Sequence, residues 1–108
     1  MRESKKASKR KAWERHISKT YGITAEQYDA ILKVQGGKCA LCRRATGATK
    51  ALAVDHDHET GAVRGICCGV CNKILGHFRD DPEAFRRGTE YLVHPPADYV
   101  LFGGPADE

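Results

Sequence analysis

The sequence lacks any apolar run of about 18 residues, the length that a membrane-spanning helix requires, so we do not expect a membrane protein. Its basic start is not followed by an apolar segment, so we expect no secretory leader. Aromatic side chains make up only 7% of the 108 residues. Since a chain of this size buries a modest core, these shortages predict one small domain that needs an added cross-link.

Positive charge is plentiful but unevenly placed. Residues 1–19 carry eight basic and two acidic side chains, whereas residues 80–108 carry two basic and seven acidic ones. The basic segment would attract a polyanion such as DNA. A solvated terminus without a partner explains the same composition, and charge alone does not decide between these interpretations. The candidate DNA contacts in this segment are Lys5, Lys6, Lys9, Arg10, Lys11 and Arg15.

Hydrophobic spacing and capping signals predict a mixed order of helices and strands. Trp13 and Ile17 share one face of a helix expected over residues 5–21. Thr24 and Gln27 form a capping box at the start of the next helix, which a pair of glycines ends. The segments expected after it are strands over 51–54 and 62–66, a helix over 72–78, a helix that begins at Pro82 with Asp81 as its cap, and no pattern after Pro96.

Four of the five cysteines form two CxxC pairs, Cys39 with Cys42 and Cys68 with Cys71, separated by 25 residues. Two such pairs present four thiolates to one tetrahedral zinc ion and leave no open position, which predicts a structural site. Disulfides and a redox motif are the competing interpretations, and the expected lack of export argues against disulfides. Zinc would add folding free energy that the small core lacks. Cys67 is expected to be a buried apolar side chain.

Between the two cysteine pairs lies the run Asp55-His56-Asp57-His58. A polar turn explains such a run, because aspartate is common in turns. The run also follows the first predicted strand, inside the loop that the zinc ion would close. A chemical role is therefore the competing interpretation.

The order of these motifs resembles a known family. The segments that carry the resemblance are LAVDHDH at 52–58, GAVRGI at 61–66 and CGVCNKILG at 68–76. Together with the CxxC pair before them, they resemble the phage recombination endonuclease VII family, which belongs to the HNH, or ββα-metal, nucleases. The similarity extends from about residue 35 to residue 92.

The resemblance implies a small α+β fold, in which a ββα-metal (HNH-type) nuclease core with a four-cysteine zinc knuckle is flanked by helices. We therefore expect three parts. A basic N-terminal arm or helix occupies residues 1–22, the zinc-stabilised nuclease domain occupies residues 23–94, and a C-terminal tail occupies residues 95–108.

By motif position, the resemblance makes Asp55 and Asn72 ligands of one catalytic Mg²⁺ or Mn²⁺ ion and His56 the general base. Oxygen ligands suit a hard cation, and an imidazole accepts a proton from water near neutral pH. The expected products carry 5′-phosphate and 3′-hydroxyl ends. His58 is expected either to contact the phosphate or to support the site from outside it. Arg64 is expected either to hold a phosphate or to pair with an acidic neighbour.

The geometry of a strand adds one expectation. Asp55 and His56 would point to opposite faces of a regular strand, so their convergence on one phosphate predicts a bulge or a strand end between them. Asn72 is also typical of a helix N-cap. Some family members have an acidic residue where this chain has Leu75, so we expect fewer protein ligands and a weak affinity for the catalytic ion.

The resulting prediction is a divalent-metal-dependent DNA endonuclease, with branched or nicked DNA as candidate substrates. The alternative is a zinc-stabilised DNA-binding or scaffolding module of a phage packaging or recombination assembly, without catalysis of its own. Besides DNA, the expected partner is a second copy of the chain, or a phage terminase or recombination protein. The expected location is the cytoplasm of the bacterial host.

Overall fold

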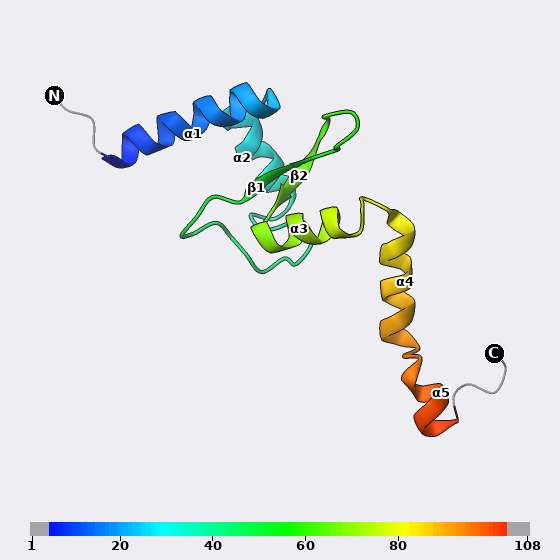
Figure 1. Cartoon of the computed structure of the whole chain (residues 1–108). Helices are drawn as coiled ribbons and strands as arrows, with labels where there is room; N and C mark the ends of the chain where they lie inside the picture. The colour runs from blue at the N-terminus through cyan, green and yellow to red at the C-terminus, as the bar shows by residue number, and fades with distance from the viewer. Residues whose placement is uncertain (1–4, 104–108) are drawn as a thin grey trace. The chain divides into compact units, whose positions relative to one another are not determined.

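The computed structural model describes residues 5–103, in which a two-stranded antiparallel sheet is accompanied by five α-helices (Figure 1). The elements are α1 (Lys5–Tyr21), α2 (Ala25–Val34), β1 (Ala53–His56), β2 (Val63–Cys67), α3 (Gly69–His77), α4 (Pro82–Val93) and α5 (Ala97–Phe102). This content confirms the expected small α+β class. The outermost parts of the predicted arm and tail, at 1–4 and 104–108, lie outside the described residues.

The chain divides into two compact units, Met1–Ile74 and Leu75–Glu108. The first unit contains both cysteine pairs and the β1–β2 hairpin, and the second contains α4 and α5. The boundaries predicted after residues 22 and 94 stay predictions. In the part of the chain that the structure describes, no helix combines the length and the apolar character needed to cross a membrane.

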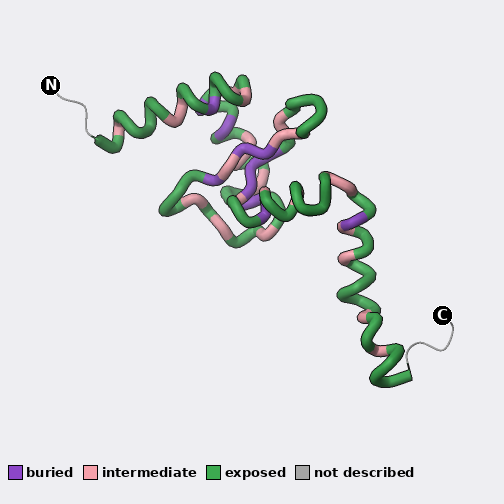
Figure 2. Tube along the Cα trace, in the orientation of Figure 1, coloured by how far each residue is buried: buried purple, intermediate pink, exposed green. Residues whose placement is uncertain are grey.

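The core of the first unit joins α1, α2 and the β1–β2 hairpin. Ile17 of α1, Tyr28 of α2, Leu52 before β1, Val54 of β1 and Ile66 of β2 are all buried and form one cluster. Buried residues accordingly concentrate on the hairpin and at points along α1 and α2 (Figure 2). The hairpin is therefore fixed to both N-terminal helices.

An aromatic pair anchors α1 to α2. Ile17 is in the core and Trp13 packs edge-on against Tyr28, with ring centroids 4.7 Å apart, which confirms that Trp13 and Ile17 share a face. The Tyr28 hydroxyl donates a 2.6 Å hydrogen bond to the Leu52 carbonyl. Burial, together with the nearby Asp29 carboxylate, raises the pKa of Tyr28, so the hydroxyl keeps the proton that it donates.

Local signals begin and end α2 as predicted. The Thr24 hydroxyl accepts from the Gln27 amide at 3.0 Å, and the Thr24 amide donates to the Gln27 side chain at 2.8 Å. At the other end Gln35 is the C-cap, and Gly36 and Gly37 follow with φ of 78° and 77°. Glycine adopts this left-handed conformation without strain.

The side chain of Gln35 joins α2 to the hairpin and to the first cysteine loop. Its Nε2 donates to the carbonyls of Lys38 (2.9 Å) and Ile66 (2.8 Å), and its Oε1 accepts from the Ile66 amide at 2.9 Å. A Cβ at Gly65 would lie only 3.1 Å from Oε1, so glycine at this position leaves room for the contact. A single polar residue after a helix forms no recognisable pattern, so this role of Gln35 could not be predicted from the sequence.

Several elements differ from the expected ones, and β2 occupies Val63–Cys67 rather than residues 62–66. β1 begins two residues late, because residues 51 and 52 belong to the preceding loop. α3 begins at Gly69 and not at Asn72, whose amide already donates to the Cys68 carbonyl at 2.9 Å. The interpretation of Asn72 as an N-cap is therefore wrong. The segment after Pro96, where no pattern was expected, forms the short helix α5.

In the second unit, the predicted cap of α4 is confirmed. The Asp81 carboxylate accepts a 3.0 Å hydrogen bond from the Glu83 amide, and Pro82 occupies the first turn. Phe78 and Phe85 pack edge-on with ring centroids 5.0 Å apart. Proline suits the first turn of α4, because a backbone N–H at that position would have no partner within the helix.

Gln35→Leu should lower the free energy of unfolding by about 2–3 kcal/mol, because it leaves the partly buried Ile66 amide and carbonyl without their partner. Urea denaturation measures this loss. Gly65→Ala should destabilise the wild type but have a smaller effect in the Gln35→Leu background, where Oε1 is gone. Equal effects of Gly65→Ala in both backgrounds would contradict the proposed contact.

Candidate active site and metal centre

Four cysteine sulfurs lie together where the first cysteine loop meets the start of α3. The ligand atoms of Cys39, Cys42, Cys68 and Cys71 all lie within 4.8 Å of one another, and the sulfurs of Cys42 and Cys68 are 4.0 Å apart. Tetrahedral zinc with Zn–S bonds of about 2.3 Å places its sulfurs about 3.8 Å apart. No disulfide joins these cysteines in the structure, and the predicted four-cysteine group fits one zinc ion.

Hydrogen bonds from backbone amides lower the pKa of some of these thiols, whereas burial raises the pKa of others. Burial raises the pKa of Cys39, but hydrogen bonds from backbone amides, that of Cys68 foremost, outweigh it and lower the pKa to about 6. Backbone hydrogen bonds also lower the pKa of Cys42. Burial raises the pKa of Cys71 to about 12 and that of Cys67 to about 12. Cys67 is thus the buried neutral side chain that was expected, outside the four-sulfur group.

A bulge interrupts the hairpin where one was predicted. Asp55 pairs with Gly65, but His56 pairs with Val63, so the register shifts between Asp55 and His56. The extra residue is Arg64, on β2. A bulge changes the direction of the side chains around it. In a regular ladder Arg64 would lie opposite His56, whereas here its side chain reaches Asp55.

Asp55 is buried and bound to Arg64. Its side chain is 5% exposed, and it is the one buried charged residue among residues 5–103. The Nε of Arg64 donates to Oδ2 at 2.8 Å, and Nη2 donates to Oδ1 at 3.0 Å. A buried carboxylate requires a partner of this kind. Of the two roles expected for Arg64, pairing with an acidic neighbour is confirmed, and contact with a phosphate stays a prediction.

The ring of His56, at the end of β1, contacts two other aromatic rings. Its ring centroid lies 5.5 Å from that of Tyr21 and 5.1 Å from that of His58. Tyr21 is the last residue of α1, and its ring also lies 6.1 Å from His16. α1 therefore brings an aromatic side chain to the predicted general base. This contact of Tyr21 could not be predicted from the sequence, because a lone aromatic residue before a glycine indicates only the end of a helix.

The other predicted site residues occupy different environments. Asn72 is half-buried in the first turn of α3, directly after Cys71. Whether it shares an ion with Asp55 stays a prediction. Asp57 accepts hydrogen bonds from the amides of Glu59 (2.8 Å) and Thr60 (3.0 Å), so it shapes the hairpin turn. For this residue the polar-turn interpretation is confirmed.

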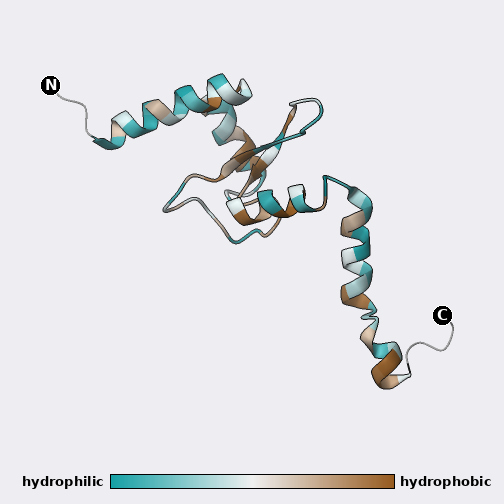
Figure 3. Ribbon diagram, viewed as in Figure 1, coloured by the Kyte–Doolittle hydropathy of each residue, from teal (hydrophilic) through white to brown (hydrophobic). Residues whose placement is uncertain are grey.

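Most of the candidate DNA contacts lie on α1, which is hydrophilic along most of its length (Figure 3). The six predicted contacts on this helix are all exposed: Lys5, Lys6, Lys9, Arg10, Lys11 and Arg15. Arg10 is engaged within the protein, because its guanidinium lies 4.5 Å from the Trp13 ring centroid and 3.5 Å from Asp29. A hollow of about 520 Å³ lies beside α2 and is lined by Lys6 and Lys9 as well as by Arg10.

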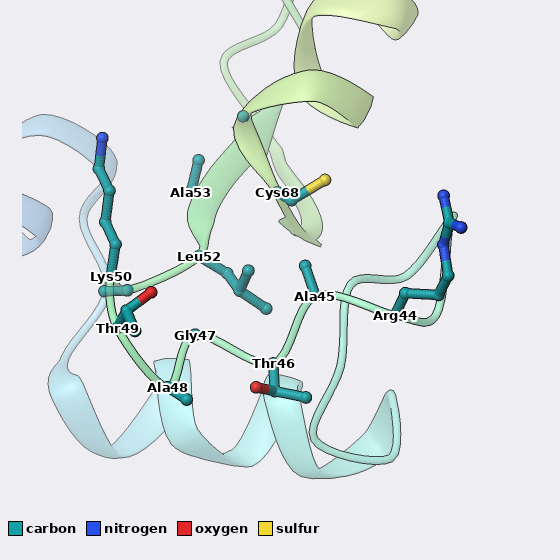
Figure 4. Close-up of a pocket in the computed structure, with 12 residues that line it drawn as sticks. Arg44, Ala45, Thr46, Gly47, Ala48, Thr49, Lys50, Leu52, Ala53 and Cys68 are labelled. Atoms are coloured by element: carbon teal, nitrogen blue, oxygen red, sulfur yellow. The ribbon is translucent and has the colours of Figure 1, made fainter.

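A second hollow of about 440 Å³ lies beside the cysteine group. The loop at 44–51 surrounds it, and Cys68 lines it from the start of α3. Leu52 points into this space, whereas Arg44 and Lys50 lie at opposite ends of it (Figure 4). The hollow adjoins the metal centre rather than the step from Asp55 to His56.

Comparison with known proteins identifies the family. The family model for recombination endonuclease VII matches residues 14–94, which is most of the chain. This chain belongs to the recombination endonuclease VII family. Its relatives include two proteins named Gene 59 protein, 54% identical in Mycobacterium phage D29 and 50% identical in Mycobacterium phage L5, each over 101 residues. The matches cover 93% of this chain but only 61% and 62% of those proteins. No solved structure matches the chain significantly.

Two neighbouring cysteines give a matched test of the metal centre. Cys68→Ala should abolish stoichiometric zinc and cooperative thermal unfolding, because a structural zinc ion contributes on the order of 10 kcal/mol to folding. Cys67→Ala should keep one zinc ion per chain and lose only about 1 kcal/mol of packing. Metal analysis and thermal denaturation measure both effects. Zinc retained by the first variant, or lost from the second, would reject this ligand set.

Proposed function

We propose that this member of the recombination endonuclease VII family is a divalent-metal-dependent DNA endonuclease with an HNH-type (ββα-metal) core. It hydrolyses phosphodiester bonds and leaves 5′-phosphate and 3′-hydroxyl ends. The observation that carries the proposal is the bulged step from Asp55 to His56, on a hairpin whose two ends the four-cysteine group joins. The chain order β1, β2, α3 supports the ββα arrangement.

In this proposal Asp55 and Asn72 hold one Mg²⁺ or Mn²⁺ ion. Carboxylate and amide oxygens are ligands that these hard cations accept. Each Asp55 oxygen accepts one hydrogen bond from Arg64 and keeps a further lone pair, so the donor set fits an ion. A bound ion supplies charge stabilisation to the phosphate and to the leaving oxygen. Because position 75 is leucine rather than an acidic residue, we expect the protein to supply few ligands to this ion.

His56 takes the proton from the attacking water in this proposal. Its half-buried ring lies between Tyr21 and His58, and these neighbours restrict the orientations that the ring can adopt. A general base must be held in direction as well as in distance to accept a proton efficiently. His58 is exposed beside it, in a position suited to contact the phosphate.

α1 supplies contacts to the DNA backbone that do not depend on sequence. Its exposed lysines can bind DNA phosphates by charge, which does not require a particular base sequence. Branched or nicked DNA is the candidate substrate, and a second copy of the chain, a terminase or a recombination protein is the candidate partner. The relatives are phage proteins, which supports action in the cytoplasm of a bacterial host.

A second candidate function is a zinc-stabilised DNA-binding or scaffolding module without catalysis. The observation that favours it is the bidentate pair of Asp55 and Arg64, which satisfies both carboxylate oxygens without any ion. Such a pair fits a residue that only stabilises the hairpin. This candidate predicts DNA binding without cleavage.

His56→Ala should lower the rate of Mg²⁺-dependent DNA cleavage by about 100-fold or more, because it removes the general base. Zinc content and DNA affinity should be unchanged. His77→Ala is the matched control, since His77 is an exposed histidine at the end of α3. Cleavage by the His56 variant at the wild-type rate would rule out this base.

Neutralising α1 should weaken DNA binding in a salt-dependent way. Lys6→Gln combined with Lys9→Gln should reduce the slope of log affinity against log salt by about 2, because each lost phosphate contact removes about 0.9. Fluorescence anisotropy on a short duplex gives this slope. Lys33→Gln combined with Lys38→Gln removes the same charge outside α1 and should leave the slope nearly unchanged. Identical slopes for the two double variants would contradict a DNA-binding α1.

A further inference from the structure

We propose that Arg64 couples binding of the divalent ion to binding of DNA. Its guanidinium holds the Asp55 carboxylate in the free protein, and it moves to a DNA phosphate when an ion binds that carboxylate. The inference rests on the proposed function, because it takes Asp55 as a ligand of the ion.

The first step concerns the two oxygens of Asp55. Arg64 engages both of them, Oδ2 at 2.8 Å through Nε and Oδ1 at 3.0 Å through Nη2. A divalent ion at the carboxylate must therefore share these oxygens with the guanidinium or displace it. Sharing places a double positive charge within a few ångströms of a single one, and like charges at this distance repel strongly away from bulk water. The pair thus opposes the ion while no DNA is present.

The second step concerns exposure. The Asp55 side chain is 5% exposed, whereas that of Arg64 is 31% exposed. Arg64 therefore contacts the buried carboxylate and is itself open to solvent, so a DNA phosphate can reach it. Arg64 is also the extra residue of the bulge, where the register of β1 and β2 shifts. Its long side chain can change partner without breaking the register of the hairpin.

The third step concerns the balance of charge. Asp55 and Arg64 neutralise each other, so an added divalent ion leaves an uncompensated double positive charge in a partly buried place. A DNA phosphate supplies negative charge there and offers Arg64 a second bidentate partner. Each ligand therefore favours the other, and by thermodynamic linkage the effect is equal in both directions.

The test measures Mn²⁺ affinity by electron paramagnetic resonance, in a His56→Ala background that keeps the DNA intact. Without DNA this protein should bind Mn²⁺ weakly, and a saturating short duplex should raise the affinity about tenfold or more. Adding Arg64→Gln should raise the affinity without DNA about tenfold and remove most of the effect of DNA. Arg44→Gln, an exposed arginine of the cysteine loop, is the matched control and should change neither value.

Unchanged Mn²⁺ affinity and an unchanged effect of DNA in Arg64→Gln would overturn the inference. If this variant does not fold, Arg64→Lys replaces it, because a single ammonium cannot span both carboxylate oxygens. Arg64→Lys should bind Mn²⁺ more tightly than its parent without DNA, and equal affinity would overturn the inference. Asp55→Asn must lose the Mn²⁺ site, and its retention would also overturn the inference.

These outcomes separate the inference from the proposed function. If the wild type cleaves DNA with Mg²⁺ while the Arg64 variants behave like their parent, the inference fails and the proposed function stands. If Mn²⁺ and DNA bind cooperatively through Arg64 but the wild type cleaves no DNA, the proposed catalysis fails, whereas the ion site at Asp55 and the inference stand.

Discussion

Four sulfur atoms hold together the two ends of the segment that carries the predicted chemistry. Cys39 and Cys42 precede this segment, Cys68 and Cys71 follow it, and their sulfurs lie within reach of one zinc ion. Closing a loop of this length costs chain entropy that a small core offsets poorly. Zinc binding would supply the missing free energy and fix the base of the hairpin. The positions of Asp55 and His56 depend on that base.

Two further contacts extend this constraint to the rest of the first unit. Gln35 hydrogen-bonds to both backbone groups of Ile66, so α2 is fixed to β2 next to the cysteine group. Ile17 buries α1 against the same core, and Tyr21 at the end of α1 contacts His56. The basic helix and the hairpin therefore belong to one packed body. The proposed DNA binding along α1 and the proposed chemistry at the hairpin would be connected through that body.

Signals confined to a few neighbouring residues predicted the structure well. The capping box at Thr24, the cap at Asp81 and the cysteine pairs each depend on local spacing. The bulge beside His56 followed from the alternation of side chains along a strand together with the roles that the family resemblance implies for Asp55 and His56. The contact of Tyr21 with His56 and the hydrogen bonds of Gln35 to Ile66 depend on how segments that are distant in the sequence pack, and no local pattern encodes that.

We propose that the hairpin hydrolyses DNA with the help of a divalent ion, while zinc stabilises its conformation. The most direct measurement incubates zinc-loaded wild-type protein with end-labelled linear, nicked and four-way DNA over a range of Mg²⁺ concentrations, and maps the product ends. The account predicts cleavage that requires Mg²⁺ and leaves 5′-phosphate and 3′-hydroxyl ends. Tight DNA binding with full zinc content but no cleavage at any Mg²⁺ or Mn²⁺ concentration would contradict it.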